Sequence, residues 1–174
     1  MKLLSKWQFI GFIFTGVLGV ILHFLYGWTG NSTLVAPFSA VNESVWEHMK
    51  LLYFPMLAFT FIEYENIGKS YSNYWCVKLA GSVTGVSLIA VLFYTLNGIF
   101  GSTPDWVNIA IFFIASALGL IFETKLMNSK TFICKSPETA KLIIVMIAFA
   151  FAVFTFFTPE IPLFQDPVTQ TYGI

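Results

Sequence analysis

The stretch WQFIGFIFTGVLGVILHFLYGW, residues 7–28, decides the fold class of this chain. It is long enough to cross a bilayer as one helix, which takes roughly 20 mainly apolar residues. No small-x-small cleavage site of a signal peptide follows it, so we interpret it as a first transmembrane helix. The composition of all 174 residues agrees, because 57% are hydrophobic and 10% are charged. A soluble domain carries roughly 25% charged residues.

Four further stretches have the same length and apolar character. Together with the first, they predict an all-α polytopic membrane protein, a bundle of five transmembrane helices in a single domain, residues 1–174. Ser or Thr followed by proline marks the start of the last two helices, near Pro104 and Pro137. The expected helices cover about residues 7–28, 45–64, 74–97, 105–126 and 139–158.

The distribution of lysine predicts the orientation in the membrane. With five helices, the N-terminus and the 65–73 and 127–138 loops share one side, and by the positive-inside rule the lysine-rich side is cytoplasmic. We therefore expect the N-terminus inside and the C-terminus outside a cell membrane, with Cys76 and Cys134 as free thiols near the reducing side. Only Lys50 lies on the outer side; on or near the inner side lie Lys2, Lys6, Lys69, Lys78, Lys125, Lys130, Lys135 and Lys141.

The outer side receives a concentrated group of ionisable residues. The segment NESVWEHMK, residues 42–50, begins the second helix there, and His23 lies near the outer end of the first helix. Two histidines and a carboxylate that leave one position for water are the ligand set of a catalytic zinc site. The sequence leaves the cofactor open, and a divalent metal such as zinc fits the predicted ligands His23, His48 and Asp166.

Three residues of this segment, Ser44, Glu47 and His48, are the candidate catalytic residues. Adjacent residues on a helix diverge by about 100°, so Glu47 and His48 do not both point at one centre. We favour His48 as the ligand or base, oriented by Glu47. In a metal-free alternative, Ser44 or a water is the nucleophile and His48 is the base. The candidate supporting residues are Asn42, Glu43, Lys50, Gln165 and Tyr172.

A structural explanation competes with the chemical one for each of these residues. Ser44 and Glu47 fit a capping box at the start of the second helix. Carboxylates at this position also favour the positive end of the helix dipole. Lys50 follows Glu47 by three residues and is able to pair with it. Three further carboxylates lie near inner helix ends, where we expect them to be solvated: Glu63, Glu65 and Glu123.

The C-terminal segment PEIPLFQDPVTQTYG, residues 159–173, is unusually apolar for a tail outside the membrane. Its prolines oppose helix formation, and a disordered tail is usually more polar. We expect residues 159–174 to fold back over the outer mouth of the bundle, with Gln165, Asp166 and Tyr172 near His48. The alternative is an interfacial strap without chemistry.

The segment VNESVWEHMKLLYFPM, residues 41–56, taken with this tail, resembles an uncharacterised prokaryotic family of small multispanning membrane proteins. Members of that family carry an N-E-S-x-W-E-H-x-K signature and an outer D-P-x-T tail. The resemblance implies a five-helix membrane domain and no established activity.

Three functions remain open on the sequence. The first is an outer-leaflet hydrolase or transferase that acts on a lipid, a lipid-linked molecule or a peptide. The second is a small cation or solute transporter with Glu43, Glu47 and His48 as its ion site, which the scattered polar residues of the last three helices disfavour. The third is an accessory subunit whose cluster only caps a helix. Membrane lipid is the expected partner, and the formal net charge of zero gives no case for nucleic acid.

Overall fold

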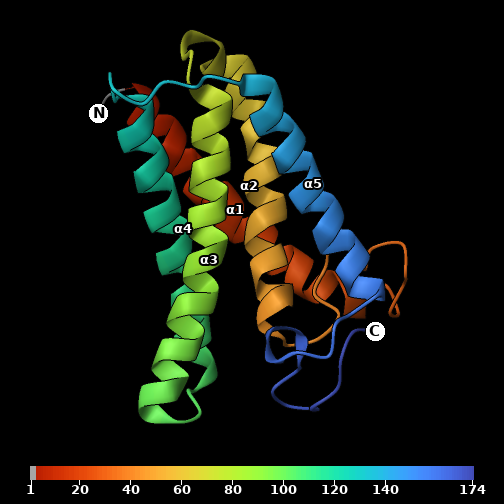
Figure 1. The fold of residues 1–174 in the computed structure, drawn as a ribbon. Coiled ribbons are helices and arrows are strands. Elements are labelled where there is room, and N and C mark those ends of the chain that lie inside the picture. The colour runs from red at the N-terminus through yellow and green to blue at the C-terminus, as the bar shows by residue number, and fades with distance from the viewer. Residues whose placement is uncertain (1–2) are drawn as a thin grey trace.

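The computed structural model describes residues 3–174, so Lys2 lies outside the described part of the chain. Within it, the chain is all-α, as predicted, and Figure 1 shows long helices joined by loops of different lengths. The one β-bridge there is isolated and joins Gln165 to Tyr172 in the tail. The helices are α1 (Leu3–Trp28), α2 (Val45–Asn66), η1 (Gly68–Ser70), α3 (Tyr74–Phe100), α4 (Asp105–Met127), α5 (Pro137–Phe156) and η2 (Pro162–Phe164).

The starts of the helices follow local sequence signals. Ser44 is the N-cap of α2, and its side-chain oxygen accepts a hydrogen bond from the backbone N–H of Glu47. Pro137 opens α5 two residues before the predicted start, because proline suits the first turn, where no backbone donor is needed. The same helix ends at Phe156, and the extended residues that follow turn back toward α2.

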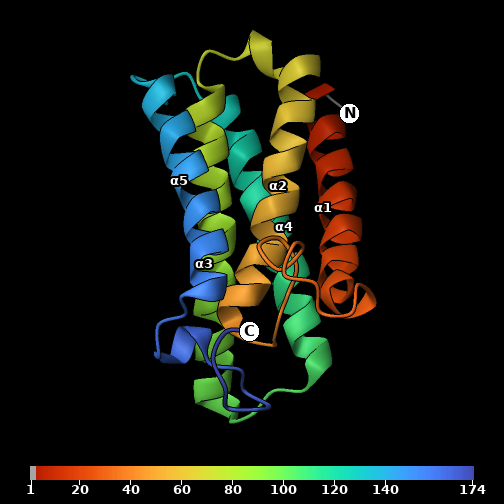
Figure 2. The same ribbon diagram turned by 90° about the vertical axis from the view of Figure 1, so that its right-hand side faces the viewer.

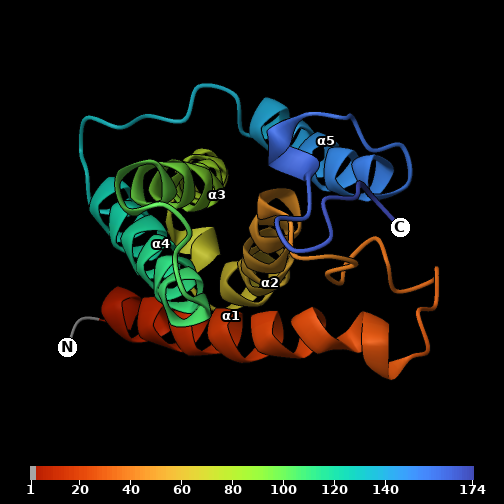
Figure 3. The same cartoon turned by 90° about the horizontal axis from the view of Figure 1, so that it is seen from below.

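Helix α2 lies at the centre of the bundle. Seen from below in Figure 3, it is enclosed between α1 on one side and α3 and α5 on the other. Its buried residues Leu52, Tyr53 and Met56 belong to the main hydrophobic core, which also includes Val86 of α3 and Phe151 of α5. The core is therefore built around α2.

Within residues 3–174, four helices are long and apolar enough to cross a membrane by length and composition: α1, α3, α4 and α5. Their outward faces carry large exposed apolar side chains, such as Phe9 and Val17 of α1 and Val145 and Phe149 of α5. Lipid is the natural environment for such surfaces. Helix α2, predicted as a fifth transmembrane helix, is not among the four because it carries Glu47, Lys50, Glu63 and Glu65.

Small residues bring α1 against α2. Pro55 has no N–H, so it cannot donate a helical hydrogen bond to the carbonyl of Leu51. A side-chain carbon built on Gly19 of α1 would lie 3.1 Å from that same carbonyl oxygen. The glycine therefore lets α1 approach the backbone of α2 at the carbonyl that Pro55 leaves without a helical donor.

The bundle has two distinct ends, which Figure 2 shows at its top and bottom. The N-terminal end holds the start of α1, the α2–α3 connection and the α4–α5 connection. The tail end holds the α1–α2 loop, the α3–α4 turn and residues 157–174. The candidate site residues of the sequence lie at the tail end.

The expectation of free thiols is wrong. A disulfide bond joins Cys76, at the start of α3, to Cys134 in the α4–α5 connection, with Cα atoms 5.5 Å apart. The side-chain amide of Asn73 donates to the backbone carbonyls of Leu126 and Phe132, which holds this connection over the start of α3. The cysteines are 58 residues apart in sequence, so their proximity depends on this tertiary contact.

We expect a thiol-alkylating reagent to leave Cys76 and Cys134 unmodified in purified, non-reduced protein and to label both after reduction. Mass spectrometry of the intact chain measures the labelling. In the control, Cys76→Ser, the remaining Cys134 thiol should react without reduction. Equal labelling of the wild-type chain before and after reduction would contradict the disulfide.

Alkylation of Cys76 and Cys134 in intact cells also tests the orientation of the chain in the membrane. Disulfides persist mainly in oxidising compartments. The lysine bias predicts that the N-terminal end, where the disulfide lies, faces the inside of the cell. A disulfide already formed in the cell would place this end outside and overturn the predicted orientation.

Candidate metal centre

Two histidines and one glutamate from three segments meet at the tail end of the bundle. His23 comes from the last turns of α1, Glu43 from the α1–α2 loop and His48 from the first turn of α2. One nitrogen or oxygen from each side chain lies within 4.8 Å of the other two. The two imidazole ring centroids are 5.8 Å apart. The arrangement therefore offers two nitrogen ligands and one oxygen ligand to a common centre.

The Glu43 carboxylate lies between the two rings. One of its oxygens is 3.7 Å from Nε2 of His23, and the other is 3.5 Å from Nε2 of His48. Good hydrogen bonds between nitrogen and oxygen are about 2.7–3.2 Å long, so neither contact is a close one. Ligand atoms on a tetrahedral zinc ion with bonds near 2.0–2.1 Å are about 3.3 Å apart. Small side-chain rotations would bring the three groups to that spacing.

The ring of His48 is held in the orientation that a metal ligand needs. Its Nδ1 is 2.9 Å from the carbonyl oxygen of Ser44, one helical turn earlier. A carbonyl only accepts, so Nδ1 carries the proton and donates it. In the neutral ring the lone pair is then on Nε2, which faces Glu43. A hydrogen bond from the second imidazole nitrogen to a backbone carbonyl is a usual way to orient a metal-bound histidine.

The C-terminal tail positions Glu43. The backbone N–H of Glu43 donates to the carboxylate of Asp166, and the side chain of Asn42 donates to the carbonyl of Gly173. Asn42 also accepts from the backbone N–H of Ser44, directly before α2. The tail thus lies on the α1–α2 loop and fixes its path next to the two histidines.

Asp166, predicted as a metal ligand, lies outside the His–Glu group, and Glu43 supplies the carboxylate in its place. The Asp166 carboxylate accepts from the backbone N–H groups of Val168, Thr169 and Glu43. Burial raises the pKa of Asp166, but these backbone hydrogen bonds outweigh it and hold that pKa below its usual value. Asp166 is therefore a turn residue that acts on the centre through the backbone of Glu43.

Gln165 and Tyr172, predicted as supporting residues, belong to the internal structure of the tail. They form an antiparallel β-bridge with each other. The side chain of Gln165 reaches the carbonyl of Gln170. Their contribution is to close the hairpin that carries Asp166.

Glu47, predicted as a catalytic residue, is committed to a buried ion pair. One of its oxygens is 2.6 Å from Nζ of Lys50 and also accepts from the backbone N–H of Val41. Lys50 in turn donates to the carbonyl of Ala36 and to the hydroxyl of Thr155. The side chains of Glu47 and Lys50 are 3% and 0% exposed, so neither reaches a substrate. The pair instead ties the α1–α2 loop and α5 to α2.

Ser44, the candidate nucleophile of the metal-free alternative, is also structural. Its hydroxyl oxygen caps α2, and the residue is 1% exposed. The capping box is incomplete, because Glu47 bonds to Val41 and Lys50 while Asn42 satisfies the N–H of Ser44. The buried hydroxyl, committed to the helix cap, argues against Ser44 as the nucleophile of the metal-free mechanism.

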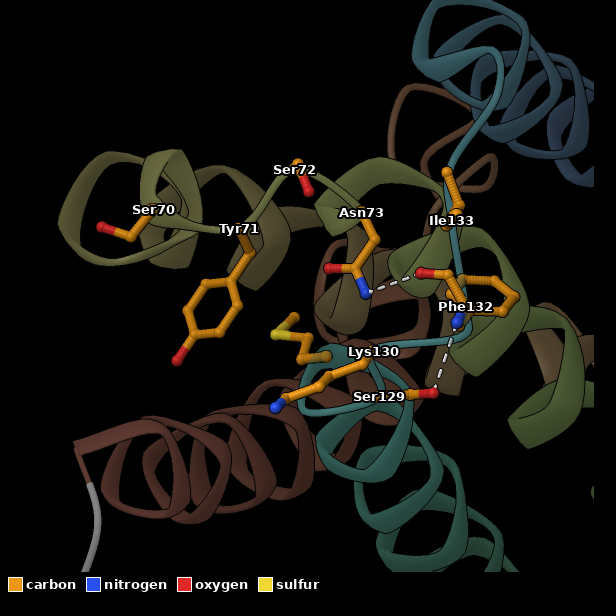
Figure 4. A pocket seen from close by; sticks show the side chains of 9 residues that line it. Ser70, Tyr71, Ser72, Asn73, Ser129, Lys130, Phe132 and Ile133 are labelled. Atoms are coloured by element: carbon orange, nitrogen blue, oxygen red, sulfur yellow. Dashed lines mark hydrogen bonds between the residues drawn. The ribbon is translucent and has the colours of Figure 1, made fainter.

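A cavity lies at the N-terminal end of the bundle, between the α2–α3 and α4–α5 connections. It has a volume of about 330 Å³, and Figure 4 shows its polar side chains around an open hollow. The N–H of Phe132 donates to Ser129, and Asn73 donates to the carbonyl of Phe132, so its walls are internally bonded. Its lining contains no histidine or carboxylate to serve as ligand or base; it consists of Ser70, Tyr71, Ser72, Asn73, Met127, Ser129, Lys130, Phe132 and Ile133.

The expectation of solvated carboxylates near the inner helix ends holds only for Glu65, which is exposed and pairs with Lys69. Glu63 and Glu123 are fully buried and both contact Lys78. Glu63, Lys78 and Glu123 lie on three different helices. No spacing pattern within one helix therefore indicates that their side chains contact one another.

For the catalytic metal site the sequence analysis placed Glu43 among the supporting residues, and only the transporter alternative counted it in an ion site. Glu43 precedes the N-cap, so its side chain does not follow the helical spacing of α2. Its 49% exposed side chain turns back toward the end of α1. The one available signal was its place in a short loop that joins the two histidine-bearing helices.

The helices and this centre define a membrane-type helical protein with a potential His–Glu metal site. The chain belongs to the family described as Family of unknown function (DUF6512), whose match covers residues 1–174. Comparison with curated proteins gave no match, and neither did comparison with solved structures.

Proposed function

We propose that this chain is a membrane metalloprotein in which His23, Glu43 and His48 bind one divalent transition-metal ion. The observation that carries the proposal is the convergence of three ligand atoms within 4.8 Å from three separate segments. Imidazole and carboxylate ligands suit zinc better than magnesium or calcium, which prefer oxygen ligands alone. The protein supplies three ligands, so a fourth position stays open for water or substrate.

We further propose that the bound ion catalyses hydrolysis or group transfer on a lipid or lipid-linked substrate. A bound metal ion of this kind activates water and polarises a carbonyl or phosphoryl oxygen. His23 and His48 are partly exposed and Glu43 is exposed, so a substrate has access to the centre. Phe24 and Trp28, exposed on the last turns of α1, stack on each other at the same end. Exposed aromatic rings are typical of the membrane interface, which favours a substrate that resides there over a soluble peptide.

The proposal includes α2 as a fifth membrane-spanning helix. Three of its four charged residues face partners inside the bundle, since Glu47 pairs with Lys50 and Glu63 pairs with Lys78, while Glu65 is exposed near the end of the helix. The neighbouring helices therefore shield α2 from lipid, which permits a charged helix to span. The lysine bias supports an outer-leaflet location for the tail end in a cell membrane, whereas the disulfide favours the opposite orientation. Alkylation in intact cells decides between them.

The test is metal-dependent turnover by purified protein in vesicles. We expect the zinc-loaded wild-type chain to cleave or transfer the head group of a component of a mixed phospholipid vesicle, as detected by mass spectrometry. The metal-free protein and the His48→Ala variant should give no product. Zinc binding without any product from phospholipid, lipid-linked sugar or peptide substrates would overturn the enzymatic part and leave a metal-binding protein.

A further inference from the structure

A second buried polar cluster lies at the N-terminal end of the bundle. Lys78 of α3 contacts two carboxylates: its Nζ is 3.0 Å from Glu63 of α2 and 2.5 Å from Glu123 of α4. Gln8 of α1 donates its amide to Glu63 over 2.9 Å. Glu47 and Glu63 are sixteen residues apart on α2, or about 24 Å along the helix axis, so this cluster is separate from the metal centre.

The charges of the cluster do not balance. The titratable groups that face one another are Glu63 from α2, Glu123 from α4, and Lys78 and Tyr74 from α3, while α1 contributes the neutral Gln8. With both carboxylates ionised and Lys78 protonated, the cluster holds one uncompensated negative charge. All three charged side chains are at most 2% exposed, so water does not screen it. Such a charge is strongly unfavourable in a buried site.

Two buried oxygen atoms in the cluster lack a hydrogen-bond partner among residues 3–174. They are Oε1 of Glu123 and Oε1 of Gln8. An ionised carboxylate and an amide oxygen only accept, so they cannot satisfy each other. Turning the Gln8 amide does not help, because Glu63 would then lose the donor that it has now. The cluster is therefore short of one hydrogen-bond donor as well as one positive charge.

One added proton supplies both the missing hydrogen-bond donor and the missing positive charge. Protonation of Glu123 at Oε1 converts this oxygen from an acceptor into a donor, and Gln8, whose own Oε1 lacks a donor, belongs to the same cluster. The same proton removes the excess negative charge. A metal cation fits less well, because the ammonium group of Lys78 already occupies the space between the carboxylates and repels a second cation.

The helices leave room for Glu123 in this place. A side-chain carbon built on Gly81 of α3 would lie 2.1 Å from Cγ of Glu123 and 2.4 Å from its Oε1. Any residue with a Cβ atom at position 81 would collide with the side chain of Glu123, so glycine is required there. A small internal cavity of about 10 Å³ also adjoins Lys78 and is lined by Tyr53, Thr60 and Ser82 among others. It has room for about one water molecule beside Lys78.

We propose that Gln8, Glu63, Lys78 and Glu123 form a proton-binding site inside the bundle, in which Glu123 carries one exchangeable proton at neutral pH. The reaction is the addition of a proton to a carboxylate, without any change in oxidation state. Such a site equips the protein to take up or release a proton inside the bundle. The proposal does not depend on metal binding at the tail end.

Infrared spectroscopy of the full chain in lipid vesicles tests the proposal. A protonated carboxyl group has a carbonyl stretching band that an ionised carboxylate lacks, and glutamate labelled with carbon-13 shifts that band. We expect the wild-type protein at neutral pH to show one such band from glutamate. Glu123→Gln should remove it while retaining a donor for Gln8. Glu63→Gln should also remove it, because Lys78 then balances an ionised Glu123. In the matched control, Glu65→Gln, the band should remain.

The wild-type spectrum alone keeps the proposal falsifiable if a variant fails to fold. No shifted band from the folded wild-type chain at neutral pH would overturn it. A band that persists in both folded variants would place the proton elsewhere and overturn it too. An absent band together with stabilisation by added sodium or potassium would show a cation site, which also contradicts the proposal.

Discussion

Replacing His48 by alanine is expected to lower the affinity for zinc by about 100-fold or more, because changing a residue that merely orients a ligand already costs 10–100-fold. His48 offers one of the three ligand atoms at the centre. Its Nε2 is oriented by the hydrogen bond from Nδ1 to the carbonyl of Ser44. Competition between the purified protein and a zinc-chelating dye measures the affinity.

The matched control is Glu160→Gln, which removes an exposed carboxylate of the same tail that lies outside the His–Glu group. We expect it to bind zinc as the wild type does. Asp166→Asn should weaken binding less than the loss of His48, because it acts through the backbone of Glu43. Zinc affinity should also fall at acid pH, since a protonated imidazole does not bind a metal ion. Equal affinity of the His48→Ala and wild-type chains would rule out this centre.

Replacing Lys50 by alanine is expected to lower the free energy of unfolding by about 3–5 kcal/mol, the usual cost of removing one partner from a buried ion pair. The change leaves the Glu47 carboxylate buried without its counter-charge. It also removes the hydrogen bonds to Ala36 and Thr155, which join the α1–α2 loop and α5 to α2. Reversible unfolding in mixed detergent micelles, followed by circular dichroism, measures the loss.

Lys69→Ala is the control for this prediction. Lys69 pairs with Glu65 at the same short range, but both side chains are more than half exposed. Exposed pairs contribute about 0–1 kcal/mol, so this variant should be nearly as stable as the wild type. Similar losses in the two lysine variants would mean that the Glu47–Lys50 pair is not a buried structural link.

The parts of the fold that the sequence predicts are those with local causes. The apolar run at residues 7–28 predicts α1, and Pro137 and Ser44 mark the starts of α5 and α2. The apolar tail was expected to contact the bundle, and the structure shows Phe164 packed on Trp46 of α2. The helix α1, the two helix starts and the packing of the tail all follow from residues that are close in sequence or from composition alone.

The parts that the sequence does not predict depend on contacts between distant segments. The disulfide joins residues 58 positions apart, and the orientation argument pointed to free thiols. Glu63 and Glu123 look like solvated helix-end residues until Lys78 of a third helix is seen between them. Within the His–Glu centre, the choice of Glu43 over Asp166 depends on the path of the tail, in which backbone N–H groups occupy the Asp166 carboxylate.

X-ray absorption spectroscopy at the zinc edge, on purified protein loaded with zinc and then dialysed, tests the central claim most directly. The account predicts one zinc ion per chain, bound by two imidazole nitrogens at about 2.0–2.1 Å together with oxygen ligands. The imidazole signal should weaken in His23→Ala and in His48→Ala. Loss of all zinc on dialysis, or a zinc environment without imidazole in the wild-type protein, would contradict the assignment of His23, Glu43 and His48 as a metal centre.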